Sequence, residues 1–427
     1  MEQNFTTINS NSAVVYKILD SLISKRFKSV HQLLKALVDG VVKSKHFNIN
    51  GGRIWELNKE EKCYELKYQS GSSKKIPDGY KQSLEQSNIF SELANLLNSR
   101  TILADETDET LIDAGVKHYA LIGVGELHRL DKGKYYEYLL GFNADTYSDN
   151  LNETLNIIST LTTLSIRNLI ALSEKNKIDK DIKKAAEIQQ NLLPDHYIEF
   201  HDYKIFGVCI PDRGVGGDFF DYIRNTYDYD DEQLTIVIGD AASKGLPAAI
   251  QALFVAGALR MGISLATKLS HVFTLLNNLV HNTFPSDRFV SLFTCELTIS
   301  SNRMVLYVNA GHSAPIHFRP STGRIKRLEA TGTFIGVMEQ QKFSVENVRM
   351  YQGDILLLFT DGIDEAQDEN GNLYGTERLY ELLNKHHRDT SKNIAYYIIE
   401  DVQKFSAKSI YSDDRTLVVI KRDEYKL

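Results

Sequence analysis

The sequence is poor in the features that mark extracellular, membrane-spanning or nucleic-acid-binding proteins. Its 427 residues include only 7 prolines and 3 cysteines, and no apolar run is long enough for a transmembrane helix. Cys63, Cys209 and Cys295 lie far apart, which argues against a disulfide framework or a structural zinc site. With 49 Lys and Arg against 56 Asp and Glu, the formal net charge is −7, which argues against a basic surface for nucleic acid. We therefore expect a cytoplasmic protein with no membrane span and no nucleic-acid partner.

Hydrophobic patterns divide the chain into three segments. Residues 14–150 read as helix, hairpin, helix, strand and strand, the order of a small α+β domain with an antiparallel sheet. Residues 151–194 form one long helical pattern almost without breakers. Residues 195–423 contain runs of strands separated by pairs of helices, which predicts a layered α+β sandwich rather than repeated βαβ units.

The helical segment carries an apolar seam with alternating four- and three-residue steps, the pattern of a coiled coil. Its phase slips by one residue in the polar run 173–177, and such a break changes supercoil winding locally. We expect this helix to pair with a second copy in a homodimer; the alternative is one amphipathic helix packed on its own chain. The seam comprises Leu151, Leu155, Ile158, Thr162, Ser165, Leu169 and Leu172, and after the slip Ile178, Ile182, Ala185, Gln189 and Leu192.

Aspartates recur beside glycines where predicted strands begin or end in the third segment. Four such acids at one end of a sheet would repel one another, and multivalent cations are the usual remedy. All-oxygen ligands favour Mg²⁺ or Mn²⁺ over zinc. Each aspartate alone has a simpler explanation as a turn former or helix cap. The acidic motifs are Gly217-Asp218, Gly239-Asp240, Asp361-Gly362 and Asp413-Asp414.

The order of the longer motifs resembles the SpoIIE/RsbU-type branch of the metal-dependent PPM (protein phosphatase 2C-like) serine/threonine phosphatases. The resemblance covers residues 185–421 and includes the helix 185–194 that leads into the domain. One departure is the loop Ala241-Ala242-Ser243-Lys244-Gly245, where the family typically has Val-Ser-Gly-Lys-Gly. The motifs are Gly216-Gly217-Asp218-Phe219-Phe220-Asp221, Gly239-Asp240-Ala241-Ala242-Ser243-Lys244-Gly245, Asn309-Ala310-Gly311-His312, Thr360-Asp361-Gly362-Ile363-Asp364-Glu365 and Asp413-Asp414-Arg415-Thr416.

This resemblance implies an αββα sandwich that binds two Mn²⁺ or Mg²⁺ ions and hydrolyses phosphoserine or phosphothreonine on a protein. Asp240 would bridge both metals, and Asp240 and Asp361 would be the catalytic residues. The other implied metal ligands are the Ala241 carbonyl, Asp361, Asp413 and Asp218, with Asp414 as an alternative to Asp413.

Two further residues of the motifs have open roles. His312 could act as a general acid or could hold a turn through hydrogen bonds. Lys244 could contact phosphate or could be a solvated loop charge.

Residues 14–150 resemble a GAF domain in length and element order. The combined interpretation is a phosphatase that a sensor domain controls through the helical linker, with a small-molecule ligand of the GAF-like domain left open. The resemblance implies a STAS-domain anti-anti-sigma-type regulator as the phosphorylated partner. The alternative is a catalytically silent interaction protein that uses both folds for docking.

Overall fold

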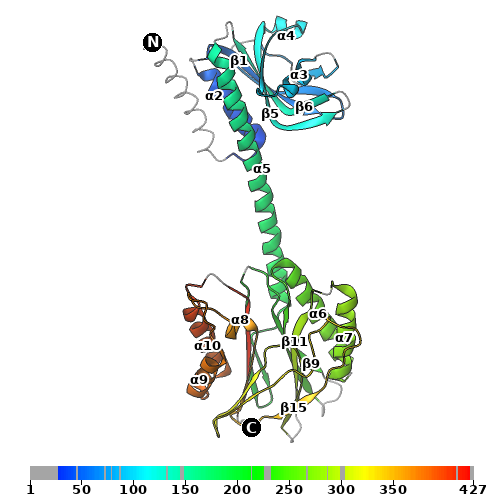
Figure 1. The fold of residues 1–427 in the computed structure, drawn as a ribbon, viewed down its shortest axis with the longest axis vertical. Coiled ribbons are helices and arrows are strands. Elements are labelled where there is room, and N and C mark those ends of the chain that lie inside the picture. The colour runs from blue at the N-terminus through cyan, green and yellow to red at the C-terminus, as the bar shows by residue number, and fades with distance from the viewer. Residues whose placement is uncertain are drawn as a thin grey trace. The chain divides into compact units, whose positions relative to one another are not determined.

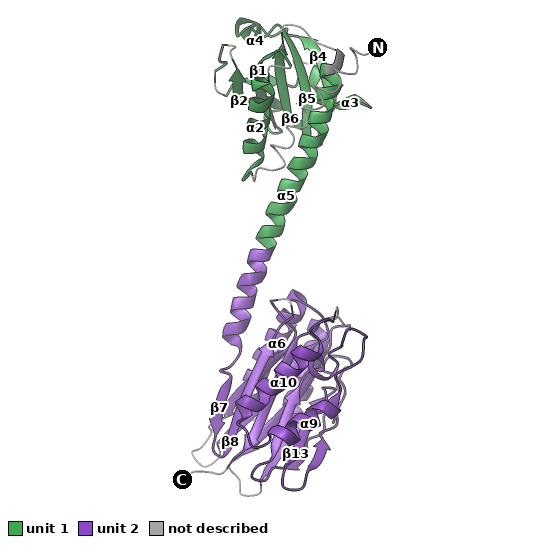
Figure 2. Ribbon diagram, turned by 90° about the vertical axis from the view of Figure 1, so that its left-hand side faces the viewer, with its two compact units in different colours: residues 1–178 green, residues 179–427 purple. Residues whose placement is uncertain are grey.

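The computed structural model describes residues 27–423, apart from residues 45–46, 72–73, 78, 86–87, 131–132, 145–148, 213, 226–231, 266–267, 286, 299–302 and 410–411. Contacts within the chain group it into two compact units, Met1–Ile178 and Asp179–Leu427 (Figure 2). The long helix α5 (Asp149–Leu192) contributes to both units. The predicted segments 14–150, 151–194 and 195–423 stay predictions, and residues 14–26 lie outside the described residues.

Unit 1 is built on one antiparallel sheet with the strand order β3-β2-β1-β6-β5-β4 (Figure 1). The sequence predicted its long strands and the helices α2 and α3, but it missed the short elements β3, β4 and α4. The elements are α2 (Val30–Lys43), β1 (Ile49–Asn58), β2 (Cys63–Gly71), β3 (Lys81–Ser83), α3 (Ile89–Asn95), β4 (Thr101–Asp105), α4 (Glu109–Asp113), β5 (His118–Leu130) and β6 (Gly133–Ala144).

Helices cover both faces of this sheet. On one face, α2 and the first part of α5 bury side chains against β1, β5 and β6. Helix α2 begins where the Ser29 hydroxyl accepts a hydrogen bond from the backbone N–H of Gln32, at 3.3 Å. On the other face, α3 and α4 pack on aromatic side chains that include Trp55 and Tyr64. Cys63, next to Tyr64 on β2, is also buried, which agrees with a packing role.

The first part of the predicted coiled-coil seam belongs to the core of unit 1. Leu151, Leu155 and Ile158 are at most 3% exposed and pack against the sheet of their own chain. This part of α5 therefore follows the alternative, a helix packed on its own chain. Further along, Leu172 and Ile178 are 61% and 59% exposed. Pairing with a second chain is thus open only to the later part of the seam.

Unit 2 contains two antiparallel sheets with the strand orders β15-β12-β11-β10-β9 and β14-β13-β16-β17-β8-β7. The predicted strands and helices of this region are all present, and the short strands β7, β14 and β15 and the short helix α8 are additional. The elements are β7 (Tyr197–Phe200), β8 (Tyr203–Ile210), β9 (Phe219–Asn225), β10 (Gln233–Ala241), α6 (Leu246–Ser264), α7 (Leu269–Thr283), β11 (Val290–Thr298), β12 (Met304–Ala310), β13 (Ile316–Arg319), β14 (Arg324–Arg327), β15 (Glu346–Arg349), β16 (Ile355–Phe359), α8 (Asp361–Asp364), α9 (Thr376–His386), α10 (Ser391–Phe405) and β17 (Arg415–Arg422).

The two sheets pack face to face between pairs of helices. Helices α6 and α7 pack on the outer face of the five-stranded sheet. The inner faces meet in a core that includes Phe220, Phe293 and Leu358. Helices α9 and α10 cover the outer face of the other sheet, so the layers run helix, sheet, sheet, helix (Figure 1). Alternate residues of each strand face opposite sides, and both faces of this sheet are covered. This explains why β16 and the middle of β17, Leu417 to Ile420, are apolar.

Two helices, Leu151–Leu192 and Leu246–Ser264, are long and apolar enough to cross a membrane by length and composition alone. Both also bury side chains in the cores of the two units, as core helices of globular domains do. The predicted absence of a membrane span therefore stays a prediction.

Candidate active site

The acidic motifs are brought together by the pairing of their strands. Gly239 at the end of β10 pairs with Phe219 at the start of β9, so Asp240 and Asp218 lie at one sheet end. In the other sheet, Phe359 at the end of β16 pairs with Leu417 near the start of β17, which brings Asp361 toward the Asp413-Asp414 pair. Acids from four separate segments of the chain therefore meet at one end of the sandwich.

Burial and the charges of neighbouring carboxylates raise the pKa values of these acids. The pKa of Asp240 is raised to about 8, first by burial and then by the negative charges of Asp361, Asp413 and Asp414. Burial and the charge of Asp240 together raise the pKa of Asp218 well above its usual value. Burial and the charge of Asp413 likewise raise the pKa of Asp361. The cluster is thus under strain that a bound cation would relieve.

Asp218 is held in place from the opposite sheet. The Thr360 hydroxyl donates a hydrogen bond of 2.6 Å to Asp218 Oδ2. The same hydroxyl accepts from the backbone N–H of Thr416 at 3.1 Å, and the Thr360 backbone N–H donates to the Thr416 carbonyl. Thr360 therefore ties Asp218 to β17 and fixes its carboxylate before any cation arrives.

The two neighbouring aspartates before β17 have different roles. Asp414 accepts hydrogen bonds from the backbone N–H groups of Asp212 and Gly217, at 2.8 and 2.7 Å, so both its oxygens hold the loop before β9. Asp413 Oδ2 instead accepts from the Lys244 ammonium at 2.8 Å. This arrangement favours Asp413 over Asp414 as the residue that faces a cation.

Two glycines are required by close backbone approach at this site. A Cβ atom on Gly216 would lie 2.2 Å from Asp414 Oδ2, and one on Gly362 would lie 1.8 Å from the Asp414 carbonyl oxygen. Neither distance is compatible with a side chain. These glycines therefore let Asp414 sit between the two loops.

The donor set fits divalent cations that prefer oxygen. The candidate ligands are carboxylates together with the Ala241 carbonyl, which is the ligand chemistry of Mg²⁺ and Mn²⁺. The Lys244 ammonium already places one positive charge on Asp413. Among the residues that the structure describes, no three His, Cys, Asp or Glu side chains converge into a ready-made coordination group. The carboxylates are thus close enough to repel one another but would have to turn inward around an ion.

His312 lies in a buried hydrogen-bond network. Its ring Nδ1 lies 2.8 Å from the Ser291 hydroxyl, and its backbone N–H donates to the Asn309 side chain at 2.8 Å. Burial lowers the pKa of His312 to about 4, so the imidazole is neutral near pH 7. This geometry favours the turn-holding alternative over a general acid.

Sequence reasoning missed two contacts next to the acids. The Gln189 side chain in the last turns of α5 donates to the Gly216 carbonyl at 2.8 Å and accepts from the Gly216 N–H at 3.3 Å. Asp221, part of the Gly216–Asp221 motif, forms an ion pair with Arg260 of α6, which also donates to the Leu192 carbonyl at 2.8 Å. Gln189 occupies a position of the predicted coiled-coil seam, so the sequence pattern assigned its side chain to a second helix. Nothing else in the sequence pointed to its contact with Gly216.

Comparison with known proteins assigns the second unit to a family. Residues 230–423 match the family model described as Stage II sporulation protein E (SpoIIE). They form a SpoIIE-type phosphatase domain. The match begins at residue 230, so it does not extend to unit 1, and the GAF resemblance of residues 14–150 is untested.

Two homologues, RsbU and RsbP of Bacillus subtilis, are named as phosphoserine phosphatases. The chain is 25% identical over 248 residues to the phosphoserine phosphatase RsbU of Bacillus subtilis, and the match covers 58% of this chain and 72% of RsbU. It is 28% identical over 286 residues to protein IcfG of Synechocystis sp., covering 60% of this chain but only 44% of IcfG. The chain thus spans less than half the length of IcfG.

Solved PP2C domains are among the structural neighbours. The SiaA PP2C domain of Pseudomonas aeruginosa aligns with a TM-score of 0.49 at 19% identity, covering 58% of this chain and 99% of that domain.

Proposed function

We propose that the chain is a metal-dependent protein phosphatase that hydrolyses phosphoserine or phosphothreonine on a partner protein. The observation that carries this proposal is the cluster of buried and half-buried, mutually repelling aspartates at one end of the sandwich. A buried cluster of like charges is costly without a compensating cation. The family match and the names of the homologues support the same reaction.

Two Mn²⁺ or Mg²⁺ ions would be held by Asp218, Asp240, Asp361, Asp413 and the Ala241 carbonyl. Such a pair of ions lowers the pKa of a bound water and stabilises the charge of in-line phosphoryl transfer. The chain's own contribution is to fix these ligands. Thr360 holds Asp218, Asp414 holds the loop before it, and strand pairing fixes Asp240.

The direct test is hydrolysis of p-nitrophenyl phosphate and of a phosphoserine protein with Mn²⁺, Mg²⁺ or a chelator. We expect turnover that requires one of the metals and disappears in Asp240→Asn. Metal-independent turnover, or turnover unaffected by Asp240→Asn, would contradict the assignment. Tight binding of a partner with no metal-dependent turnover would favour the alternative, a catalytically silent interaction protein.

We further propose that unit 1 is a GAF-like sensor domain and that α5 transmits its signal. Support comes from each end of α5 separately: Leu155 and Ile158 are part of the unit 1 core, and Gln189 bonds to the loop that precedes Asp218. Insertions of one, three or four residues near Asn176, where the heptad phase slips, test the coupling. Unchanged basal activity in all three insertion variants would rule it out.

The proposed assembly is a cytoplasmic homodimer. Leu172 and Ile178 are exposed members of the predicted seam, and their pairing in a second copy would bury them. Replacing both with Glu should convert a dimer to a monomer in sedimentation equilibrium. A monomeric wild-type chain would refute the proposal.

For the substrate, we propose a phosphorylated STAS-domain regulator, as the family resemblance implies. The test compares release of phosphate from a phosphoserine STAS-domain protein with release from a phosphotyrosine peptide. Equal rates on both would contradict a serine/threonine-specific partner.

A further inference from the structure

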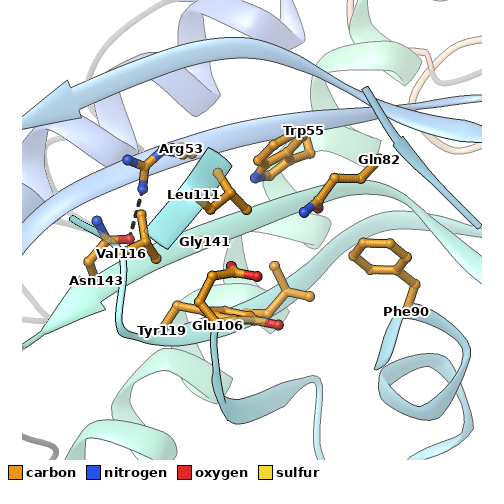
Figure 3. A pocket seen from close by; sticks show the side chains of 11 residues that line it. Arg53, Trp55, Gln82, Phe90, Glu106, Leu111, Val116, Tyr119, Gly141 and Asn143 are labelled. Carbon is orange, nitrogen blue, oxygen red and sulfur yellow. Dashed lines mark hydrogen bonds between the residues drawn. The ribbon is translucent and has the colours of Figure 1, made fainter. Parts of the chain in front are cut away.

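Unit 1 contains a cavity between its sheet and the helices α3 and α4, far from the acids of unit 2 in sequence (Figure 3). About 390 Å³ of empty space lies in the cavity together with the open solvent at its mouth, so the recess itself is smaller. Small-molecule sites are mostly apolar with a few polar groups. The apolar and aromatic part of the wall is formed by Trp55, Phe90, Leu111, Val116, Tyr119 and Leu121.

One end of the cavity carries a buried positive charge. Arg53 on β1 is only 4% exposed, and its Nη1 donates a hydrogen bond of 2.8 Å to Asn143 Oδ1, drawn as a dashed line in Figure 3. This bond fixes the direction of the guanidinium. The amide nitrogen of Asn143 is buried and has no hydrogen-bond partner among the described residues. A buried donor without an acceptor is costly, so a ligand acceptor here would be favourable.

A negative charge lines the same cavity. Glu106 follows β4, and its Oε1 accepts from the backbone N–H groups of Thr107 and Asp108, at 2.9 and 3.0 Å. These bonds hold the carboxylate against the cavity. Burial raises the pKa of Glu106, and the positive charge of Arg53 opposes that effect, so the two groups act on each other through the cavity.

We propose that this cavity binds a free α-amino acid with an apolar side chain. Its carboxylate would lie at Arg53 and Asn143, its ammonium group at Glu106, and its side chain against Trp55 and Phe90. An anion alone would face the Glu106 carboxylate, and a cation alone would face the Arg53 guanidinium. A zwitterion matches both charges, and the aromatic wall selects an apolar side chain.

This inference deepens the sensory role proposed for unit 1. Only the effect of the amino acid on phosphatase activity depends on that proposed role. Binding of the amino acid is measured independently of turnover. A chain that binds an amino acid without a change in turnover would refute the sensory coupling and leave the site intact.

The experiment is isothermal titration calorimetry and thermal unfolding of the full chain with L-leucine, L-valine and L-phenylalanine. We expect at least one of them to release or absorb heat at one site per chain and to raise the melting temperature. Two analogues of leucine test the two charges separately: 3-methylbutylamine lacks the carboxylate, and 4-methylpentanoate lacks the ammonium group. We expect each analogue of the bound amino acid to bind at least about 10-fold more weakly, which corresponds to one lost charged contact.

Variants of the chain give the matching result from the protein side. Glu106→Gln should weaken binding of the amino acid by about 10-fold. Glu109 is an exposed residue in the first turn of α4, and Glu109→Gln should leave binding unchanged. Arg53→Met should abolish binding, with circular dichroism used to check that unit 1 still folds. No binding of any of the three amino acids, or equal binding of 4-methylpentanoate, would overturn the proposal. Equal affinity in Glu106→Gln and wild type would overturn it even if Arg53→Met failed to fold.

Discussion

The Gln189 side chain and the Gly216 backbone form a reciprocal pair of hydrogen bonds, with Nε2 donating to the carbonyl at 2.8 Å and Oε1 accepting from the N–H at 3.3 Å. Gln189 lies in the last turns of α5, and Gly216 lies two residues before Asp218. Gly217 in turn donates to Asp414. A short chain of bonds thus links the end of the linker helix to the proposed metal site.

Replacing Gln189 with Leu removes both bonds and leaves the buried Gly216 N–H and carbonyl without partners. We expect this to lower the stability of unit 2 by about 1–3 kcal/mol and to change metal-dependent turnover, because the loop before Asp218 loses its anchor. Gln190→Leu is the matched control, since Gln190 is exposed on the same helix. Urea unfolding and p-nitrophenyl phosphate hydrolysis measure the two effects. Identical turnover in both variants would show that the contact is only structural.

Asp240→Asn should have opposite effects on the metal-free and metal-loaded protein. Without metal, burial and the charges of Asp361, Asp413 and Asp414 force Asp240 either to take up a proton on folding or to carry an unfavourable charge. Removing the carboxylate should therefore raise stability by about 1–3 kcal/mol at neutral pH. With Mn²⁺, the wild type should be stabilised and the variant not. Turnover should fall by more than about 100-fold, because even outer-shell changes at metal sites cost 10–100-fold.

Thermal unfolding with Mn²⁺ and with a chelator measures both parts of this prediction. Asp287→Asn, an exposed change in the same unit, is the control and should match the wild type in both conditions. A variant at Asp240 that is less stable than wild type without metal would argue that the acids do not repel one another in the folded protein.

The Lys244 ammonium competes with any cation for Asp413, because it lies 2.8 Å from Asp413 Oδ2. Lys244→Met should therefore tighten metal binding by about two- to five-fold, the range expected for loss of a largely exposed ion pair. The readout is the Mn²⁺ concentration at which half of the thermal stabilisation is reached, which does not depend on any contact between Lys244 and phosphate. Lys268→Met, exposed at the start of α7, is the control. A weaker metal affinity in Lys244→Met would contradict this role.

Most of the second unit could be predicted from sequence because its signals are local. Apolar runs such as 355–359 end in Asp-Gly or Gly-Asp, and buried strands of this kind need no partner to be recognised. Which surface buries the residues of the heptad seam could not be predicted in the same way. Leu151 and Ile158 have the spacing of a coiled coil, but the sheet of their own chain buries them first. Helical periodicity reveals an apolar face and not what covers it.

The acid cluster shows the same limit at the level of single side chains. The motifs identified Asp413 and Asp414 as a pair, but both lie before one strand and nothing local distinguishes them. The difference arises from contacts distant in sequence. The backbone N–H groups of Asp212 and Gly217 donate to Asp414, and the Lys244 ammonium donates to Asp413. The cavity at Arg53 and Glu106 was missed for the same reason, since its charges come from separate strands.

Asp354 at the start of β16 gives a prediction with a defined pH dependence. Burial alone would raise its pKa, but hydrogen bonds from His317 and Arg319 outweigh burial and lower it below the usual value. An acid whose pKa is lowered on folding stabilises the protein above its unfolded pKa, about 4, and this contribution is lost as the pH falls through the folded value. Asp354→Asn should therefore cost about 2–4 kcal/mol at neutral pH, because His317 and Arg319 lose a buried charged partner.

The difference in stability between wild type and Asp354→Asn should shrink as the pH falls below about 4, where the wild-type carboxylate takes up a proton. Urea unfolding of both proteins at a series of pH values measures this difference. Glu346→Gln, an exposed acid on β15, is the control and should follow the wild type at each pH. If the difference in free energy of unfolding stays constant at every acidic pH, protonation of Asp354 does not change it. The ionised carboxylate would then contribute nothing to stability, and the variant would be less stable because the Asn side chain packs poorly.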